Sequence, residues 1–157
     1  MTTKQLIAIS EDPKQFLLSG KHIKDLIAAK KDRILDWKLR AESITAPMGD
    51  RIDGGKNSCS YKESTVAKAV ESIVDLQNEI QDEILELMHT EKEIGKAISA
   101  LVSDHRHRTV LEMRYLNGYS ERAISFKLSY GEDWIYRLHT AALASMQNEA
   151  KKKLKNI

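Results

Sequence analysis

Apolar residues recur at alternating steps of three and four positions over two long stretches of the chain. In the first stretch these positions hold Ile23, Ile27, Lys30, Ile34, Trp37, Ala41 and Ile44. Lys30 is the one polar residue among them. Such a row forms a strip along an α-helix and is typical of a coiled-coil seam. We expect this helix to end at Ala46, because the residue before a proline avoids the helical region.

The second stretch has the same spacing and predicts another long helix, which begins near Ser64 or Thr65. Its row consists of Val66, Ala69, Ile73, Leu76, Ile80, Ile84, Leu87, Ile94, Ile98 and Leu101. The steps are three or four residues except between Leu87 and Ile94, where Glu91 takes the row position. A helix with one such strip buries it against a partner helix.

Residues 46–61, which lie between the two rows, contain one proline, three glycines and the lone cysteine of the chain, Cys59. Proline and glycine interrupt helices, so we predict a mobile loop here. A single cysteine allows neither an intrachain disulfide nor a cysteine-based zinc site.

The two rows carry opposite charge. Residues 21–45 hold seven Lys and Arg against four Asp and Glu, whereas residues 61–100 hold four against nine. We therefore predict an antiparallel hairpin over residues 21–101, in which opposite charges face each other across the seam. The alternative is that both charged faces are simply solvated. Residues 1–20 form an extension with short helices, and Asp12-Pro13 reads as an N-cap followed by the first helical position.

Three shorter helical segments follow within residues 102–150. The first runs from Ser103 to Leu116 and ends at Asn117-Gly118, a helix stop signal. The second begins at Ser120, a good N-cap, and ends near Leu128. The last runs from Glu132 to about Lys153. We expect their apolar contacts to join Ile124, Leu128, Ile135, Leu138 and Leu143 to Val110, Leu111 and Met113.

Two helices joined by the short turn Ser129-Tyr130-Gly131 are typical of a helix-turn-helix, whose second helix enters the major groove of DNA. In this interpretation residues 120–128 form the supporting helix and Glu132 begins the recognition helix. Residues 151–157 form a basic tail that we expect to fray. The predicted fold class is thus all-α, with a long two-helix hairpin followed by a C-terminal three-helix module.

The residues of this module, together with two upstream segments, carry a family resemblance. Val110-Leu-Glu-Met-Arg-Tyr-Leu-Asn-Gly118, Tyr119-Ser-Glu-Arg-Ala-Ile124, Leu128 and Ile135-Tyr-Arg-Leu-His-Thr-Ala-Ala-Leu143 resemble region four of bacterial sigma factors. Upstream, Ser43-Ile-Thr-Ala-Pro47 and the stretch from Val70 to Ile80 are similar to sigma-like late transcription regulators of phages from Gram-positive bacteria. The two resemblances cover most of residues 20–147.

The resemblance implies a phage transcription regulator that binds a promoter or operator in double-stranded DNA and contacts host RNA polymerase. It implies DNA-facing residues on the first two turns of the last helix, namely Glu132, Asp133, Tyr136 and Arg137. Arg106, Arg108, Arg114 and Arg122 would reach the flanking phosphates. His139 completes the predicted DNA-binding set, in a structural or backbone-contact role.

One departure from the family pattern opens an alternative. The predicted recognition helix begins with Glu132 and Asp133, which stabilise the helix dipole but repel phosphate. A second hypothesis is therefore a helical adaptor or inhibitor that binds a host protein and has weak or lost DNA binding. Trp134, next in the chain, fits the core and an exposed anchor equally well.

Composition narrows the function classes further. Aromatic residues make up 6% of the 157 residues and charged residues 31%, which favours long exposed helices. No phosphate loop, nucleophile elbow or His-Glu metal motif is present, so we expect no enzyme activity, metal or cofactor. No run approaches the ~20 apolar residues needed to span a bilayer. We expect a cytoplasmic, nucleoid-associated protein in the bacterial host, and homodimerisation stays open.

Overall fold

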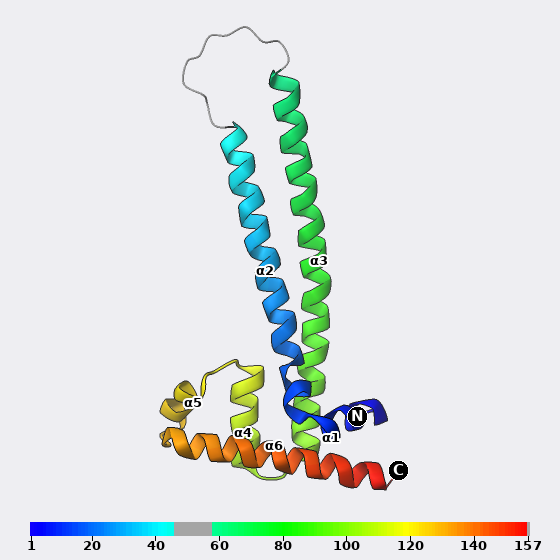
Figure 1. Ribbon diagram of the computed structural model, residues 1–157, viewed down its shortest axis with the longest axis vertical. Coiled ribbons are helices and arrows are strands. Elements are labelled where there is room, and N and C mark those ends of the chain that lie inside the picture. Colours follow the sequence, from blue (N-terminus) through cyan, green and yellow to red (C-terminus); the bar gives the residue numbers. More distant parts are fainter. Residues whose placement is uncertain (46–57, 157) are drawn as a thin grey trace. The chain divides into compact units, whose positions relative to one another are not determined.

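The computed structural model describes residues 1–45 and 58–156 (Figure 1). The elements in chain order are α1 (Thr3–Glu11), α2 (Pro13–Thr45), α3 (Ser58–Leu101), α4 (His105–Leu111), the π-helical turn η1 (Glu112–Leu116), α5 (Glu121–Leu128) and α6 (Glu132–Lys155). These ranges contain no strand, so the predicted all-α class is confirmed. Within them, no helix combines the length and the apolar character that crossing a membrane requires.

The chain divides into two compact units. Unit 1 consists of Met1–Lys24 and Glu86–Ile157, and unit 2 is Asp25–Leu85. This division differs from the boundaries drawn on the sequence at residues 20 and 101. The N-terminal extension and the adjoining ends of both long helices belong with the C-terminal helices, because their apolar residues share one core.

In unit 2, α2 and α3 lie side by side and run in opposite directions (Figure 1). The α2 row is buried at Ile27 and Ile34 and half-buried at Lys30, Trp37 and Ala41. The α3 row is buried at Ala69, Leu76 and Ile80 and half-buried at Val66, Ile73 and Glu83. Ile84 was expected in this row but is 40% exposed, and Glu83 takes its place. The steps of three and four therefore continue without interruption.

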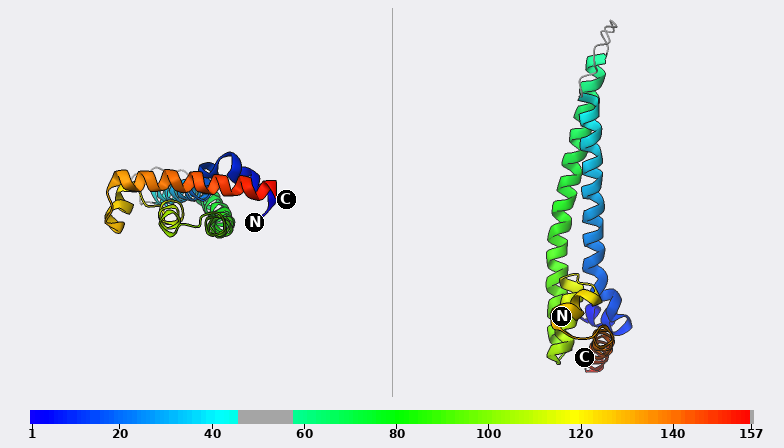
Figure 2. Two further views of the ribbon diagram at one scale, coloured as in Figure 1. Left: turned by 90° about the horizontal axis from the view of Figure 1, so that it is seen from below. Right: turned by 90° about the vertical axis from the view of Figure 1, so that its left-hand side faces the viewer.

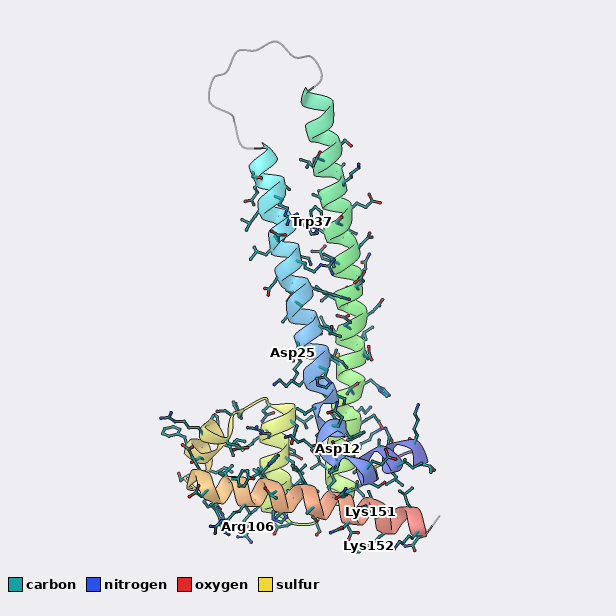
Figure 3. All side chains as sticks on the ribbon, in the orientation of Figure 1. Asp12, Asp25, Trp37, Arg106, Lys151 and Lys152 are labelled. Atoms are coloured by element: carbon teal, nitrogen blue, oxygen red, sulfur yellow. The ribbon has the colours of Figure 1, made fainter. Side chains whose placement is uncertain are left out.

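Glu83 occupies this row position because it meets a cation. Lys30 Nζ lies 2.5 Å from Glu83 Oε1 and 2.8 Å from Glu79 Oε2. The hydrogen bonds that Lys30 donates to the two carboxylates raise its pKa, and Lys30 in turn lowers the pKa of Glu79. Lys30 of the α2 row and Glu83 of the α3 row thus face each other, and Trp37 follows Lys30 two turns further along the α2 row (Figure 3).

Both long helices extend further toward the N-terminus than expected. Asp12-Pro13 indicated the helix start at Pro13, with Asp12 Oδ1 accepting from the backbone N–H of Gln15 at 3.0 Å, but this helix is α2 itself and not a short helix of a separate 1–20 extension. Helix α3 starts at Ser58 rather than near Ser64, so residues 58–61 of the predicted loop are helical. The remainder of that loop, and the side chains of Ile44 and Cys59, lie outside the described residues.

The core of unit 1 is built around α6, which lies across α1 and α4 (Figure 2). Its buried residues come from both ends of the chain and include Leu6, Ile9, Leu17, Ile94, Ile98, Leu101, Leu111, Ala142 and Met146. Gln147 of α6 also donates to the backbone carbonyl of Ser10 at 3.0 Å. Helix α6 extends to Lys155, so most of the predicted basic tail is helical.

Candidate nucleic-acid interface

Helices α5 and α6 are joined by a tight turn that the local sequence explains. Ser120 is the N-cap of α5, as predicted, and its Oγ accepts from the backbone N–H of Ala123 at 3.2 Å. Helix α5 ends at Leu128, and Ser129 adopts the left-handed conformation with φ of 56°. Ser125 Oγ donates to the carbonyl of Tyr130 at 2.5 Å, which ties the turn back to α5.

A small apolar cluster fixes α5 and α6 against α4. Val110, Ile124, Ile135 and Leu138 are buried together, and Met113, Tyr119 and Leu128 pack around them. The predicted contacts of Ile124, Ile135 and Leu138 with Val110 are therefore confirmed. Leu111 and Leu143 belong instead to the larger core of unit 1. The cluster determines which face of α6 remains in solvent.

The first two turns of α6 present polar side chains outward. Ile135 and Leu138 point into the cluster, which leaves Asp133, Tyr136 and Arg137 on the opposite side. Tyr136 is 61% exposed, and Arg137 is also exposed. Thr140 follows one turn later and is exposed as well, with Oγ1 donating to the carbonyl of Tyr136 at 2.9 Å. This face of α6 is exposed to solvent.

The charge on this face is mixed. Arg122 of α5 lies 3.9 Å from Glu132, and both side chains are largely exposed. An exposed pair of this kind is worth roughly 0–1 kcal/mol, so Arg122 can exchange Glu132 for another anion. Asp133 shares the exposed face with Arg137. The two acids stabilise the positive N-terminal end of α6 and lower its attraction for polyanions.

Three predicted arginines stand in three different settings. Arg106 is exposed, with Nε 3.8 Å from Asp104 (Figure 3). Arg108 donates from Nε and Nη2 to the carbonyl of Val102, just beyond the end of α3. Arg114 lies 3.5 Å from Glu121 and connects η1 to α5. Arg106 is thus available to a ligand, whereas Arg108 and Arg114 hold the module together.

His139 does not belong to this surface, so its place in the predicted DNA-binding set is corrected. It is 7% exposed, and its Nε2 lies 2.9 Å from the hydroxyl of Tyr115. Burial lowers the pKa of His139 and raises that of Tyr115. Of the two roles predicted for His139, this burial supports the structural one and not a contact with the DNA backbone. On the sequence, Tyr115 gave no sign of its role, because it lies 24 residues from its partner.

Three aromatic groups near the turn are exposed; the sequence analysis gave no role to Phe126 and Tyr130, and it left Trp134 open between the core and an exposed anchor. Phe126 is 88% exposed, and Tyr130 and Trp134 are 41% and 43% exposed. Phe126 lies outside the apolar spacing that Ile124 and Leu128 define, and that mismatch is the signal that could have revealed it. Tyr130 and Leu128 also line a shallow pocket with His105, Arg106 and Thr109.

No known protein family, curated protein or solved structure matches the chain. Among the described residues, no group of three or more histidine, aspartate or glutamate side chains is arranged to hold a metal ion.

Proposed function

We propose that α5, the turn and α6 form a helix-turn-helix that binds double-stranded DNA, with α6 as the recognition helix. The observation that carries this proposal is the exposure of Tyr136 and Arg137 on the first two turns of α6, whose opposite face is buried. In the wider proposal, the module is carried on the long hairpin of α2 and α3. The protein is then a phage-type transcription regulator that acts at promoters and contacts host RNA polymerase.

Each exposed residue has a distinct role in this proposal. Arg137 reads guanine through a bidentate pair of hydrogen bonds or holds a phosphate, and Tyr136 donates to phosphate or contacts a thymine methyl group. Arg122 and Arg106 bind the flanking phosphates. Arg108 and Arg114 contribute less, because their guanidinium groups are already engaged within the protein. His139 supports the module from inside.

The mixed charge of the surface sets the expected binding behaviour. With about three phosphate contacts per chain, the logarithm of the binding constant should fall against the logarithm of salt concentration with a slope of about −3. Specific DNA should bind more tightly than random DNA, since Arg137 contributes to sequence readout.

The test begins with selection of binding sites from a random duplex library, because the operator is not specified by the protein surface. Fluorescence anisotropy then measures binding of the selected duplex at several salt concentrations. Arg137→Ala should lose roughly 1–3 kcal/mol of specific binding. Arg33→Ala, which removes the same charge from an exposed position of α2, is the matched control and should bind nearly as tightly as wild type. Equal losses in both variants, or no salt-dependent binding to any duplex, contradict the proposal.

A second candidate, a protein-binding adaptor, is favoured by the exposure of Phe126. Because Phe126 is 88% exposed, its replacement should change the stability of the free protein little. The same side chain can contribute strongly to the binding free energy of an interface that covers it. Purified bacterial RNA polymerase is the probe. Under this alternative, the protein binds duplex DNA weakly or not at all, and Phe126→Ala abolishes capture of the polymerase while Arg137→Ala leaves it unchanged. If Arg137→Ala weakens DNA binding while Phe126→Ala leaves DNA binding unchanged, the protein binds DNA and the polymerase through two different surfaces.

A further inference from the structure

The solvent side of α6 continues well beyond the two turns assigned to the DNA surface. Exposed residues follow one another along it at alternating steps of four and three positions, and they are Arg137, Ala141, Ala144, Asn148, Lys151 and Lys155. Such spacing places side chains in one row along an α-helix. The opposite side of this part of α6 is buried at Ala142, Met146 and Ala150. The row thus begins with the arginine of the DNA surface and ends with lysines.

This row has cations at both ends and no acidic residue between them. Its three middle positions hold two alanines and an asparagine. After Asp133, the one acid of α6 is Glu149, which is half-buried and lies 2.5 Å from Lys152 Nζ. A polyanion that lies along the row therefore meets no carboxylate in it.

The lysines lie at the opposite end of α6 from the turn (Figure 3). Among the described residues, Lys151 and Lys155 have no ion pair. Lys152 pairs with Glu149, but its side chain is 69% exposed, and a competing anion can replace so exposed a partner. Like charges one turn apart on a helix repel each other, as Lys151 and Lys155 do. A bound anion relieves that repulsion.

The length of the row determines which part of a duplex its far end can reach. With a rise of about 1.5 Å per residue, Lys151 and Lys155 lie about 21 and 27 Å along α6 from Arg137. The major groove completes a turn around the duplex within about 34 Å, whereas α6 is straight (Figure 2). A helix that holds Arg137 in the groove therefore leaves it before Lys151. The groove is bordered by phosphates, which suit the compact charge of lysine.

An anionic membrane fits the same charges less well. A helix that lies on a membrane buries large apolar side chains in the lipid beside its cations. Between Arg137 and Lys151 this row offers two alanines and an asparagine, so it has no such side chain. Double-stranded DNA, which needs charge alone at its backbone, is the occupant that the row favours.

We propose that Lys151, Lys152 and Lys155 form a second phosphate-binding site, which holds the DNA backbone where α6 leaves the major groove. This inference rests on the proposed function and extends its DNA surface to the last turns of α6. Phosphate contacts add affinity for any sequence but no sequence readout. With about three further contacts, the salt dependence of binding steepens from a slope of about −3 to one of about −5.

The test is a variant that removes the three charges together, Lys151→Gln with Lys152→Gln and Lys155→Gln. Lys153 is kept, because its Nζ donates to the carbonyl of Ala100 at 3.2 Å. Glutamine and lysine have similar helix propensity, so the helical circular dichroism should be unchanged. In anisotropy titrations between about 50 and 200 mM salt, wild type should lose about 1000-fold in affinity for the selected duplex and the variant about 60-fold. At each salt concentration the variant should weaken selected and random duplexes by the same factor.

The matched control removes three lysines from exposed positions of α2, as Lys21→Gln with Lys31→Gln and Lys38→Gln. It has the same net charge as the α6 variant and should keep the salt dependence of wild type. Hydroxyl-radical footprinting of the selected duplex then locates the contact. The α6 variant should lose protection at one edge of the footprint and keep it at the centre, where Arg137 binds.

Failure of this inference is distinguishable from failure of the proposed function. If the α6 variant keeps the slope and the footprint of wild type, or if both triple variants have equal effects, the second site is wrong while the helix-turn-helix stands. If the α6 variant instead loses only its binding to vesicles of anionic lipid, the lysines bind a membrane surface and the inference is likewise wrong. If wild type binds no duplex, both proposals are wrong.

Discussion

The hydroxyl of Tyr115 and Nε2 of His139 lie 2.9 Å apart inside unit 1, where they join η1 to α6. Their rings stack with centroids 5.8 Å apart. Both side chains are at most 7% exposed, so neither can exchange its partner for water without a local opening. Burial and the charge of Arg114 lower the pKa of His139, and the imidazole is therefore held in its neutral form.

This pair predicts a loss of stability in mild acid. The ordinary pKa of His139 is 6.5, and the folded protein lowers it. As the pH falls below about 6.5, the unfolded chain takes up a proton that the folded protein resists, so the free energy of unfolding decreases. Above that pH both states are neutral and the effect vanishes. Urea denaturation between pH 7.5 and 5 should therefore show a decline that is smaller in His139→Gln.

Tyr115→Phe serves as the control for this effect. It removes the hydrogen bond but leaves the buried imidazole, and should lower the free energy of unfolding by about 1–3 kcal/mol at neutral pH. Its decline with acid should persist, because His139 still titrates. If His139→Gln declines with pH as steeply as wild type, the buried histidine is not the source.

The Lys30–Glu83 contact predicts a compensating double variant in the seam of unit 2. Glu83 Oε2 is already buried without a hydrogen-bond partner, the one such side-chain atom in the described parts of the chain. Lys30→Met should therefore destabilise the protein, since it leaves the carboxylate facing an apolar seam. Adding Glu83→Leu should recover the stability, because the seam then has apolar side chains at both positions.

Urea denaturation of the full chain measures this recovery. Lys31→Met, at the adjacent exposed position, controls for loss of a positive charge and should change the free energy of unfolding by less than about 0.5 kcal/mol. If the double variant is no more stable than Lys30→Met alone, the unpaired Glu83 carboxylate is not the cause of the destabilisation, and the prediction is wrong.

The local signals in the sequence were sufficient for the helices near the turn. Ser120 was recognisable as an N-cap because a serine hydroxyl satisfies a free N–H at a helix start. Gly118, with φ of 73°, was recognisable as a stop because glycine adopts this conformation without steric cost. Such signals depend on a few neighbouring residues, so they can be recognised in a single sequence.

Features that depend on distant residues were not accessible in the same way. The choice of Glu83 over Ile84 for the seam depends on Lys30, which lies 53 residues away in the chain. The burial of His139 likewise depends on Tyr115 and on the packing around α6. Periodicity alone favours the apolar residue and cannot detect a cation on the opposing helix.

The acidic start of α6 predicts a variant that binds DNA more tightly. Asp133 lies on the exposed face of α6 with Arg137. The described part of the chain shows no ion pair for its carboxylate, which therefore repels phosphate. Asp133→Asn should therefore strengthen binding to random duplex DNA, most clearly at low salt, where charges are least screened. Anisotropy titrations at two salt concentrations measure this.

Its side effect on folding should be small. Removing one acid from the first turn of a helix lowers stability by about 0.3–1 kcal/mol. Lys127→Gln on α5, which changes the net charge in the opposite direction, should weaken binding to the same duplex. If Asp133→Asn binds random DNA more weakly than wild type, the face does not approach phosphate.

The left-handed Ser129 predicts that the turn between α5 and α6 can be stabilised by one substitution. Its φ of 56° is unfavourable by about 1–2 kcal/mol for a residue with a Cβ atom. Glycine removes that strain but loses more conformational entropy on folding, by about 0.5–1 kcal/mol. Ser129→Gly should thus gain up to about 1 kcal/mol, which raises Tm by about 2–4 °C in a chain of this size.

Two companion variants separate strain from hydrogen bonding in this turn. Ser129→Ala keeps the Cβ atom and therefore should not raise Tm. Ser125→Ala removes the hydroxyl that donates to Tyr130 and should lower stability by about 0.5–1.5 kcal/mol. A rise in Tm for Ser129→Ala equal to that for Ser129→Gly would exclude backbone strain as the cause. The turn sets the position of α6 against α5, so its geometry determines where Tyr136 and Arg137 are presented.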